Sequence, residues 1–575
     1  MAQGTSTHET ISRRGLVCAG GAAAALVAGS AALSGLAKAA EGDKVTVSFV
    51  DTIAWDAEYD VVVVGWGGAG SVAAITAAEN GAKVLLTEKA PEGGEGGNTK
   101  VCEQYLCTPN TVEDGVAFYT AMSAGFDTST PEVIQYMAEG SVGNVDWLLA
   151  HGAPAVAGKY EVPQEEGEAD PNGTPSAEMM TWIYEKSDGT KAVSEYPIWP
   201  DGTPMDGRID EFKMVNPPDH EEKKYWNLLR ENVVALKDSI DIWYESPATH
   251  LIQDPFTKTI LGLKIERGGK ELNVRALNGV VLACGSYEAN QEMFENYAQF
   301  SQAYPIGTTN NTGDGIKMGL EVGADLWHMD ALSGPWILPK FHEIDRCYFG
   351  TNIAGQRITT AGNCIYVGSD AKRFMNESGT QKHGHVKIGG SWISQPVSDV
   401  MWAVMDATGR NGGGTIATMD EAEIIEGASL EELAATIGLD AEALSATVAE
   451  WNDIVAAGVD PKFERLDISM APIETAPFYA VRLYPACVNC QGGPKRNTNC
   501  EVLDPNGDPI PNLYSAGELG SFWAGVYICG GNISETCYTG RTAGENAAKP
   551  KDAPAPVELT VVASDPTANG TDLAE

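Results

Sequence analysis

The sequence has few basic residues for its length. Of its 575 residues, 38 are Lys or Arg and 79 are Asp or Glu, so the formal net charge is -41 at pH 7. A surface with this charge repels nucleic acid and anionic membranes, which excludes both as expected partners. We interpret it as a solvated acidic surface, and attraction of a basic partner is the alternative.

Several motifs are also missing. The sequence contains no Cys-x-x-Cys-His, which excludes a covalently attached c-type haem. No internal repeat is visible along the chain. The eleven cysteines stand mostly in apolar or glycine-rich strings, such as the one around Cys284, and we interpret them as buried small residues rather than disulfide partners.

The N-terminal segment has a weakly apolar run in place of a membrane span. The pair Arg13-Arg14 precedes a run from Gly15 to about Leu36 that is rich in Ala and Gly, and small residues follow around Ala39. Its Ala, Gly and Ser content makes the run a poor membrane helix, which is the alternative interpretation. Residues 1–39 are therefore predicted to be a twin-arginine signal peptide, which places the mature protein outside the cytoplasm without an integral membrane anchor.

A glycine-rich motif follows the first apolar run of the mature chain. Four valines, from Val61 to Val64, lead into Gly65, Gly67 and Gly70, and Glu88 closes the next apolar run, 18 residues beyond Gly70. This is the order of a strand, a tight turn and a helix start, with an acidic residue placed for a ribose. The helix start presents its positive end to phosphate groups, so the motif predicts a dinucleotide site.

A second segment far downstream completes this site. Gly517-Glu518 follows a predicted strand, and Gly531-Asn532 opens a predicted helix. Glu518 is expected on the ribityl chain, and the helix start at the pyrimidine edge of a flavin, where it stabilises the charge gained on reduction. No second strand with a Gly-x-Gly-x-x-Gly turn occurs, so FAD is the expected cofactor and a separate nicotinamide domain is not expected.

Between these segments, apolar residues at a spacing of three and four over 430–438 and 441–451 predict two amphipathic helices. Together with the glycine motifs, the chain resembles the flavoprotein superfamily of soluble fumarate reductases, urocanate-type reductases and 3-ketosteroid dehydrogenases. The resemblance covers about residues 58–548 and is carried, in this order, by residues 65–70, 96–99, 281–285, 312–315, 373–377, 430–439, 477–481 and 517–544.

The resemblance implies an α/β fold with a Rossmann-like, glutathione-reductase-type FAD-binding domain that is split in sequence by an inserted α+β capping domain. The expected parts are the signal peptide at 1–39, the FAD-binding domain at 40–334 and 486–548, the cap at 335–485, and a mobile tail at 549–575. Non-covalent FAD is expected to contact Gly65, Gly67, Gly68, Ala69, Gly70, Glu88, Lys89, Gly97, Asn98, Thr99, Ala283, Gly285, Asp314, Gly517, Glu518, Gly531, Asn532 and Ile533.

The chain departs from the fumarate reductases at three places. A histidine pair is expected before Gly492-Gly493, where the string from Cys487 to Gln491 stands instead. The substrate-binding arginine is replaced by Ile528, and no arginine follows the 373–377 motif within the next six residues. A small dicarboxylate needs several cations when it leaves water, so fumarate and succinate are not the expected substrates.

Other residues are the catalytic candidates. Tyr527 can polarise a carbonyl oxygen or donate a proton, as a tyrosine does near this turn in ketosteroid dehydrogenases, or it can simply pack on the flavin. Tyr105 is a second candidate, and Lys382 or His383 in the cap can protonate the α-carbon. Arg373 is expected to hold the cap together with Glu377, and proton relay is its alternative role.

Two further groups were weighed as metal or redox sites. Cys487 and Cys490, with Cys500, have the spacing of cluster ligands or of a redox dithiol, but we interpret them as structural. His383 and His385 lack helical spacing and partners, so no metal is expected.

The sequence thus predicts an exported FAD-dependent reductase of an activated, α,β-unsaturated carbonyl C=C bond. Its electrons are expected from a separate donor, a cytochrome or a membrane-linked redox protein. A 3-ketosteroid-type dehydrogenase working in the oxidative direction is one alternative. A flavin-binding electron carrier without turnover is another, and the predicted cap argues against it.

Overall fold

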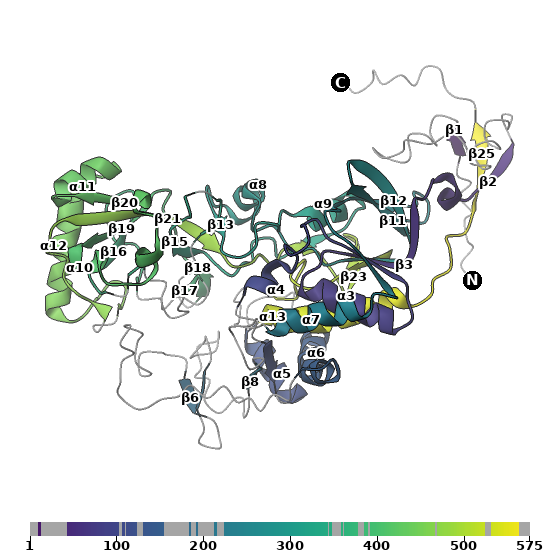
Figure 1. Cartoon of the computed structure of the whole chain (residues 1–575), viewed down its shortest axis with the longest axis horizontal. Coiled ribbons are helices and arrows are strands. Elements are labelled where there is room, and N and C mark those ends of the chain that lie inside the picture. The colour runs from purple at the N-terminus through teal and green to yellow at the C-terminus, as the bar shows by residue number, and fades with distance from the viewer. Residues whose placement is uncertain are drawn as a thin grey trace.

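The computed structural model shows a larger lobe around α3 and α13, a second lobe around α11 and α12, and a small sheet of β1, β25 and β2 at the far end of the larger lobe (Figure 1). The structure describes residues 10–12, 43–102, 106–109, 111–122, 130–153, 183–185, 191–193, 212–215, 224–342, 344–347, 358–359, 361–377, 384–388, 391–465, 469–523 and 531–562.

The centre of the larger lobe is a parallel sheet built from both ends of the chain. Its parallel strands are, in spatial order, β9 (Ile240–Trp243), β4 (Val84–Thr87), β3 (Ala57–Val64), β12 (Lys270–Leu282) and β24 (Pro509–Ser515). Val61, Val62 and Val63 are 0% exposed, because both faces of the sheet are covered, and such strands carry continuous apolar runs.

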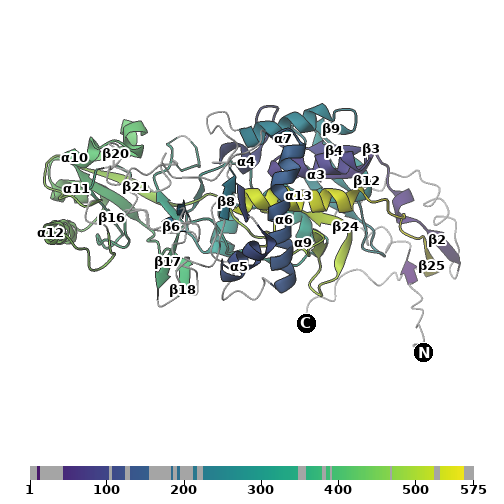
Figure 2. The same cartoon turned by 90° about the horizontal axis from the view of Figure 1, so that it is seen from below.

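Helices cover one face of this sheet and antiparallel strands cover the other. The first half of β12 pairs with β11 (Ile260–Arg267), which pairs with β10 (Ala248–Gln253). Figure 2 shows the helices running over the opposite face: α3 (Gly68–Glu79), α6 (Pro131–Ala150), α7 (Lys224–Ala235) and α13 (Gly531–Ala548). α3 packs against α13 so closely that a Cβ at Gly540 would lie 2.8 Å from the Cβ of Val72.

The second lobe has its own mixed sheet and its own apolar core. Its long strand β21 (Phe478–Cys487) pairs with β13 (Tyr304–Pro305), β15 (Trp336–Leu338), β19 (Met401–Asp406) and β20 (Ile424–Gly427), and β19 pairs with β16 (Cys364–Val367). The two predicted amphipathic helices are confirmed as α11 (Leu430–Ile437) and α12 (Ala441–Ala457). Leu433, Leu444 and Trp451 of these helices are fully buried against the sheet.

Strand β21 joins the two lobes. Its residues 478–483 pair with β19 in the second lobe, and its last residues pair with β13 and β15. The chain then runs directly into Val488 and Asn489, which line a pocket of the first lobe. The predicted mixed α/β fold, with a Rossmann-like domain split in sequence, is confirmed. The residue limits of the predicted domains stay a prediction.

The remaining elements are short. They are α4 (Gly97–Val101), β5 (Leu106–Pro109), α5 (Val112–Met122), β6 (Ile183–Glu185), β7 (Lys191–Val193), β8 (Phe212–Val215), α8 (Gln291–Met293), α9 (Asp314–Glu321), β14 (Leu326–Trp327), β17 (His385–Ile388), β18 (Ser391–Ser394), α10 (Ala407–Arg410), β22 (Gly493–Pro494) and β23 (Glu501–Leu503). Within the described ranges, no helix has the length and apolar character needed to cross a membrane.

The C-terminal segment from residue 549, whose mobility stays a prediction, contains one strand. β25 (Val557–Val562) pairs with β2 (Lys44–Val47) and with β1 (Thr10–Ser12). In the sequence, Val557, Leu559 and Val561 alternate with Glu558 and Thr560, a pattern typical of strands. Residues 13–39, most of the predicted signal peptide, and residues 563–575 lie outside the described ranges.

Candidate active site

A pocket of about 1050 Å³, including space open to solvent, lies at the carboxyl ends of β3, β12 and β24. Val64, Ala283 and Ala516, each at or next to the end of one of these strands, line it. The carboxyl ends of parallel strands are where α/β sheets bind their ligands. The pocket therefore lies where the two glycine motifs predicted it.

The turn between β3 and α3 explains why glycines are needed there. Gly65 has φ +96°, and a Cβ on it would lie 2.7 Å from the Cα of Cys284. A Cβ on Gly70 would collide with the carbonyl oxygen of Gly65. The glycines bring the start of α3 against the neighbouring strand, so its unpaired N–H groups face the pocket.

Glu88 supports this turn and lines the pocket. Its carboxylate accepts hydrogen bonds from the backbone N–H groups of Trp66, at 2.8 Å, and Ala90, at 2.7 Å. Each carboxylate oxygen still has lone-pair capacity toward the pocket. Lys89, which also lines the pocket, pairs with Asp314 at 2.7 Å.

The far segment reaches the same pocket through α13. Asn532 in the first turn of α13 lines the pocket and is 6% exposed, and among the described residues neither its side-chain oxygen nor its nitrogen has a partner. A native protein rarely leaves both atoms of a buried amide unpaired, so Asn532 points to a polar ligand. Gly517, with φ +74°, lets the preceding turn approach α3, since a Cβ there would lie 2.8 Å from that of Ala69.

A buried ion pair holds this far segment together. Arg496 is 1% exposed and donates to Glu535 of α13, at 2.6 Å, and to the carbonyl oxygen of Gly517, at 2.9 Å. Glu535 in turn accepts from the backbone N–H of Phe522, at 2.8 Å. The turn that carries Glu518 is thus tied to α13. Phe522 and Trp523 are buried and are not among the residues that line the pocket.

Four side chains form a polar group at the pocket, in which Glu288 and Asn311 are buried and Asn98 and Glu518 are partly buried. Asn98 and Asn311 each donate through Nδ2 to both Glu288 and Glu518. Burial raises the pKa of Glu288 to about 7 and that of Glu518 well above its ordinary value. Glu288 and Asn311 were missed from the sequence. The sequence signal that could have identified Glu288 is its position, as an acidic residue, shortly after the tight turn that follows β12.

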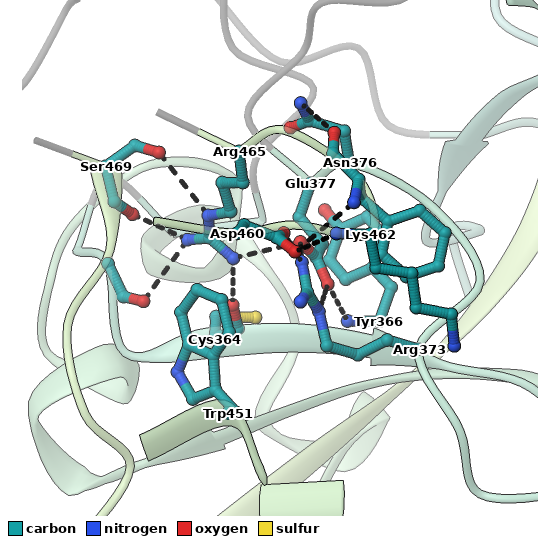
Figure 3. A network of polar contacts seen from close by, with 12 residues as sticks. Cys364, Tyr366, Arg373, Asn376, Glu377, Trp451, Asp460, Lys462, Arg465 and Ser469 are labelled. Carbon is teal, nitrogen blue, oxygen red and sulfur yellow. Dashed lines mark hydrogen bonds and ion pairs between the residues drawn. The ribbon is translucent and has the colours of Figure 1, made fainter. Parts of the chain in front are cut away.

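Arg373 lies in the second lobe, in the network that Figure 3 shows. It donates to both carboxylate oxygens of Glu377, at 2.7 Å each, and to Asp460 at 2.8 Å. Arg465 reaches the same carboxylate of Glu377 at 3.1 Å, and both guanidinium groups lie over the ring of Trp451 in α12. The network joins α12 to the edge of the sheet, which supports a structural role for Arg373. A role in proton relay stays a prediction.

Two cationic neighbours keep Glu377 charged. Burial alone would raise its pKa, but the hydrogen bonds from Arg373 and the charge of Arg465 hold the pKa below its usual value. A carboxylate in this state is a poor proton donor near neutral pH.

The profile of the FAD binding domain family matches residues 60–533. The chain belongs to this family. It binds FAD and is a FAD-dependent oxidoreductase. Among its relatives, it is 27% identical to a probable fumarate reductase of Shewanella frigidimarina, covering 85% of this chain and 74% of that protein. It is 26% identical to the digoxin reductase of Eggerthella lenta, covering 86% of this chain and 88% of that protein.

The fold is shared with a solved steroid enzyme. The crystal structure of 3-ketosteroid delta1-dehydrogenase from Sterolibacterium denitrificans, in complex with 1,4-androstadiene-3,17-dione, superposes with a TM-score of 0.62. The identity is 21%, and the match covers 86% of this chain and 100% of that chain. This identity supports the fold alone.

Nearly all of the residues that were predicted to contact FAD line the pocket described above. Those that line it are Gly65, Gly67, Gly68, Ala69, Glu88, Lys89, Gly97, Asn98, Thr99, Ala283, Gly285, Asp314, Gly517, Glu518, Asn532 and Ile533. Gly70 and Gly531 stand next to lining residues without lining the pocket themselves. The unpaired amide of Asn532 and the glycine turn fit FAD, although the contact made by each residue stays a prediction.

The other catalytic candidates cannot be placed in the same way. Tyr105, Lys382, His383 and Tyr527 lie outside the described residues. Their roles stay predictions from the sequence.

The cysteine pair has the properties of buried packing residues. The sulfur atoms of Cys487 and Cys490 lie 3.8 Å apart, and burial raises the pKa of both thiols. A raised pKa keeps a thiol protonated and unreactive. Neither side chain lines the pocket, and the described part of the chain contains no group of three or more His, Cys, Asp or Glu that could hold a metal ion.

Proposed function

We propose that the protein is an exported FAD-dependent reductase of an activated carbon–carbon double bond, and that its substrate is an uncharged or bulky enone or aryl-acrylate. The relatives named as fumarate and digoxin reductases support the general class of reaction. When bound, FAD supplies a hydride donor or acceptor at its N5 atom. The twin-arginine motif supports the proposed extracytoplasmic location.

The observation that carries the choice of substrate is the lack of matching cations in the sequence: Ile528 stands where the substrate-binding arginine of the fumarate reductases is expected, and residues 378–383 contain no arginine. Among the described residues that line the pocket, Lys89 is the one cation, and it is paired with Asp314. Asn489, a neutral amide that is 3% exposed, lines the pocket where a histidine of the fumarate reductases is expected. A desolvated dicarboxylate needs several cations, so their absence at the matching places of the sequence supports an uncharged or bulky substrate.

Within this proposal, the residues have the following tasks. Tyr527 donates a hydrogen bond to the substrate carbonyl, with Tyr105 as the second candidate, and so stabilises the negative charge that develops on the oxygen. Lys382 or His383 gives a proton to the α-carbon. The second lobe excludes water, since β21 leads from its sheet directly into the pocket at Val488.

Electrons are proposed to come from a separate protein. The chain encodes no haem attachment motif and no second dinucleotide motif of its own. A cytochrome or a membrane-linked redox protein outside the cytoplasm can supply them.

The test is an anaerobic screen of the holoenzyme with reduced viologen as electron donor. We expect turnover with members of a panel of enones, cinnamates and steroids, and little with fumarate. Tyr527→Phe is expected to lower kcat by about 100-fold, the usual contribution of a positioned proton donor. Tyr479→Phe in the second lobe is the matched control.

Three outcomes would contradict the proposal. Efficient fumarate reduction would show that the pocket accepts a dicarboxylate. Flavin reduction by saturated ketones without reoxidation by enones would assign the oxidative direction, as in a ketosteroid dehydrogenase. Reoxidation by none of the organic acceptors would favour an electron carrier.

A further inference from the structure

Two carboxylates at the FAD pocket share the same pair of amides. The Nδ2 atom of Asn311 lies 2.6 Å from Glu288 Oε1 and 2.9 Å from Glu518 Oε1. The Nδ2 atom of Asn98 lies 2.6 Å and 3.1 Å from the same two oxygens. Glu288 is 0% exposed, and Glu518 faces the pocket, so the group connects the buried interior with the cofactor.

The surrounding backbone holds the Asn98 amide in one orientation. Its Oδ1 accepts from the N–H of Thr308 at 3.0 Å, so its NH₂ group must face the carboxylates. A Cβ at Gly307 would collide with this Oδ1, and a Cβ at Gly285 would lie 2.5 Å from Asn311. The site is therefore built to hold two amide donors between two acids.

No cation balances these acids. Among the residues that the structure describes, neither Glu288 nor Glu518 forms an ion pair, because Arg496 pairs with Glu535 and Lys89 pairs with Asp314. Amide hydrogen bonds stabilise one carboxylate, but two carboxylates that share the same donors repel each other strongly.

The titratable groups around Glu288 and Glu518 do not take up a proton in place of these two acids near neutral pH. Burial raises the pKa of the thiols of Cys487 and Cys490 and of the phenol of Tyr287, which pack beside Glu288, so all three stay neutral. Burial also raises the pKa of Glu535, an acidic neighbour of Glu518 on α13, but Glu535 differs from the pair because it forms an ion pair with Arg496 at 2.6 Å. The two facing carboxyl groups, whose pKa values are raised, are left to take up the proton.

We propose that Glu288 and Glu518, which accept hydrogen bonds from the same amides of Asn98 and Asn311, hold one proton between them. This proton sets how tightly the pocket holds FAD. Glu288 is thus a positioning residue that acts through Glu518. FAD brings two negative charges on its pyrophosphate, and its reduction adds negative charge at the pyrimidine edge. Keeping the proton leaves the acid pair with one negative charge instead of two beside this anionic cofactor. The inference rests on FAD binding and is independent of the substrate proposed above.

The pH dependence of FAD binding tests this directly. As the pH rises, the pair loses its proton and gains a second charge, so we expect the Kd for FAD to rise by about tenfold between pH 6 and pH 9, which corresponds to a change of about one pKa unit on binding. In Glu288→Gln, Glu518 no longer shares its amide donors with a second acid, so the Kd for FAD is expected to change by less than about threefold between pH 6 and pH 9. Glu266→Gln, at an exposed position of β11, is the matched control and should behave as the wild type.

The measurement is titration of the deflavinated protein with FAD, followed by flavin fluorescence. In parallel, calorimetry of the unmodified protein in two buffers of different ionisation enthalpy should show proton uptake on FAD binding at pH 8. This second measurement does not depend on the folding of a variant. Binding without proton uptake, or an equal pH dependence in Glu288→Gln, would overturn the proposal. Failure of the wild type to bind FAD at any pH would instead contradict the family assignment.

Discussion

At the scale of single residues, the structure separates acids that stay charged from acids that hold a proton. Glu377 lies between two arginines, and Arg373 with Arg465 lowers its pKa, whereas Glu288 has only amide donors and its pKa rises. Both side chains are almost fully buried. The difference arises from the partners and not from burial, because desolvation acts on both in the same direction.

The Glu377 network yields a prediction for the stability of the second lobe. Glu377→Gln leaves two buried guanidinium groups short of a counter-charge, so unfolding should become easier by about 3 kcal/mol, as when buried ion pairs lose one partner. Glu450→Gln, on the exposed side of α12, is the control and should change stability by less than about 0.5 kcal/mol. Urea unfolding at pH 7 measures both, and equal stability of the two variants would contradict a structural role of the network.

The same network predicts how stability depends on pH. Because the folded pKa of Glu377 lies below its unfolded value of about 4.3, its contribution is complete above that pH and is lost as the pH falls through the folded pKa. The stability difference between wild type and Glu377→Gln should therefore be constant from pH 7 to about pH 5 and shrink in more acidic solution. A difference that shrinks between pH 8 and pH 6 would mean that Glu377 titrates near neutral pH and can relay protons.

At the scale of elements, the contact between α3 and α13 connects the two cofactor segments. A Cβ at Gly544 would lie 2.5 Å from the carbonyl oxygen of Ala73, and a Cβ at Gly540 would lie 2.9 Å from that of Ala69. Glycine weakens a helix relative to alanine. These glycines therefore serve the helix crossing, which sets where both helix starts meet the pocket.

Replacement of one of these glycines tests the crossing. Gly544→Ala favours the helix locally but forces α3 and α13 apart, so we expect a net loss of about 2 kcal/mol in the free energy of unfolding. FAD affinity should fall as well, because the start of α13 moves with the helix. Glu545→Ala, at the next and exposed position, should leave both quantities nearly unchanged. Thermal unfolding and FAD titration measure these effects, and a stabilised Gly544→Ala with normal FAD affinity would contradict this account.

At the scale of the whole molecule, the pocket brings together segments that are far apart in the sequence. The pocket is lined by the turn at Gly65–Gly68, by residues around Asn98 and Ala283, and by the start of α13. The strand β25 lies at the opposite end of the larger lobe in Figure 1 and does not line the pocket. Cofactor binding should therefore need α13 but not the C-terminal strand.

Two truncations separate these parts. A chain that ends at residue 548 keeps α13 and should bind FAD with a flavin absorbance per protein close to that of the full chain. A chain that ends at residue 530 lacks α13 and Asn532 and should bind essentially none. Full flavin content in the shorter chain would show that the far segment is not part of the cofactor site.

Local patterns in the sequence predicted the dinucleotide site and the helices of the second lobe, and the family resemblance implied the mixed α/β fold. The valine run before Gly65 and the spacing to Glu88 are local patterns, and so are the apolar stripes of α11 and α12. Such patterns follow from the periods of strands and helices and from the freedom of glycine.

Only the tertiary structure decided which polar residues meet. Glu288, Asn311 and Arg496 stand in ordinary sequence surroundings, and β25 lies in a segment that was expected to be mobile. Residues that form such contacts can be up to 514 positions apart in the sequence, as the pair of Lys44 and Glu558 in β2 and β25 shows. The energies of such contacts depend on charge and burial at the meeting point, and neither is written in the sequence around one residue alone.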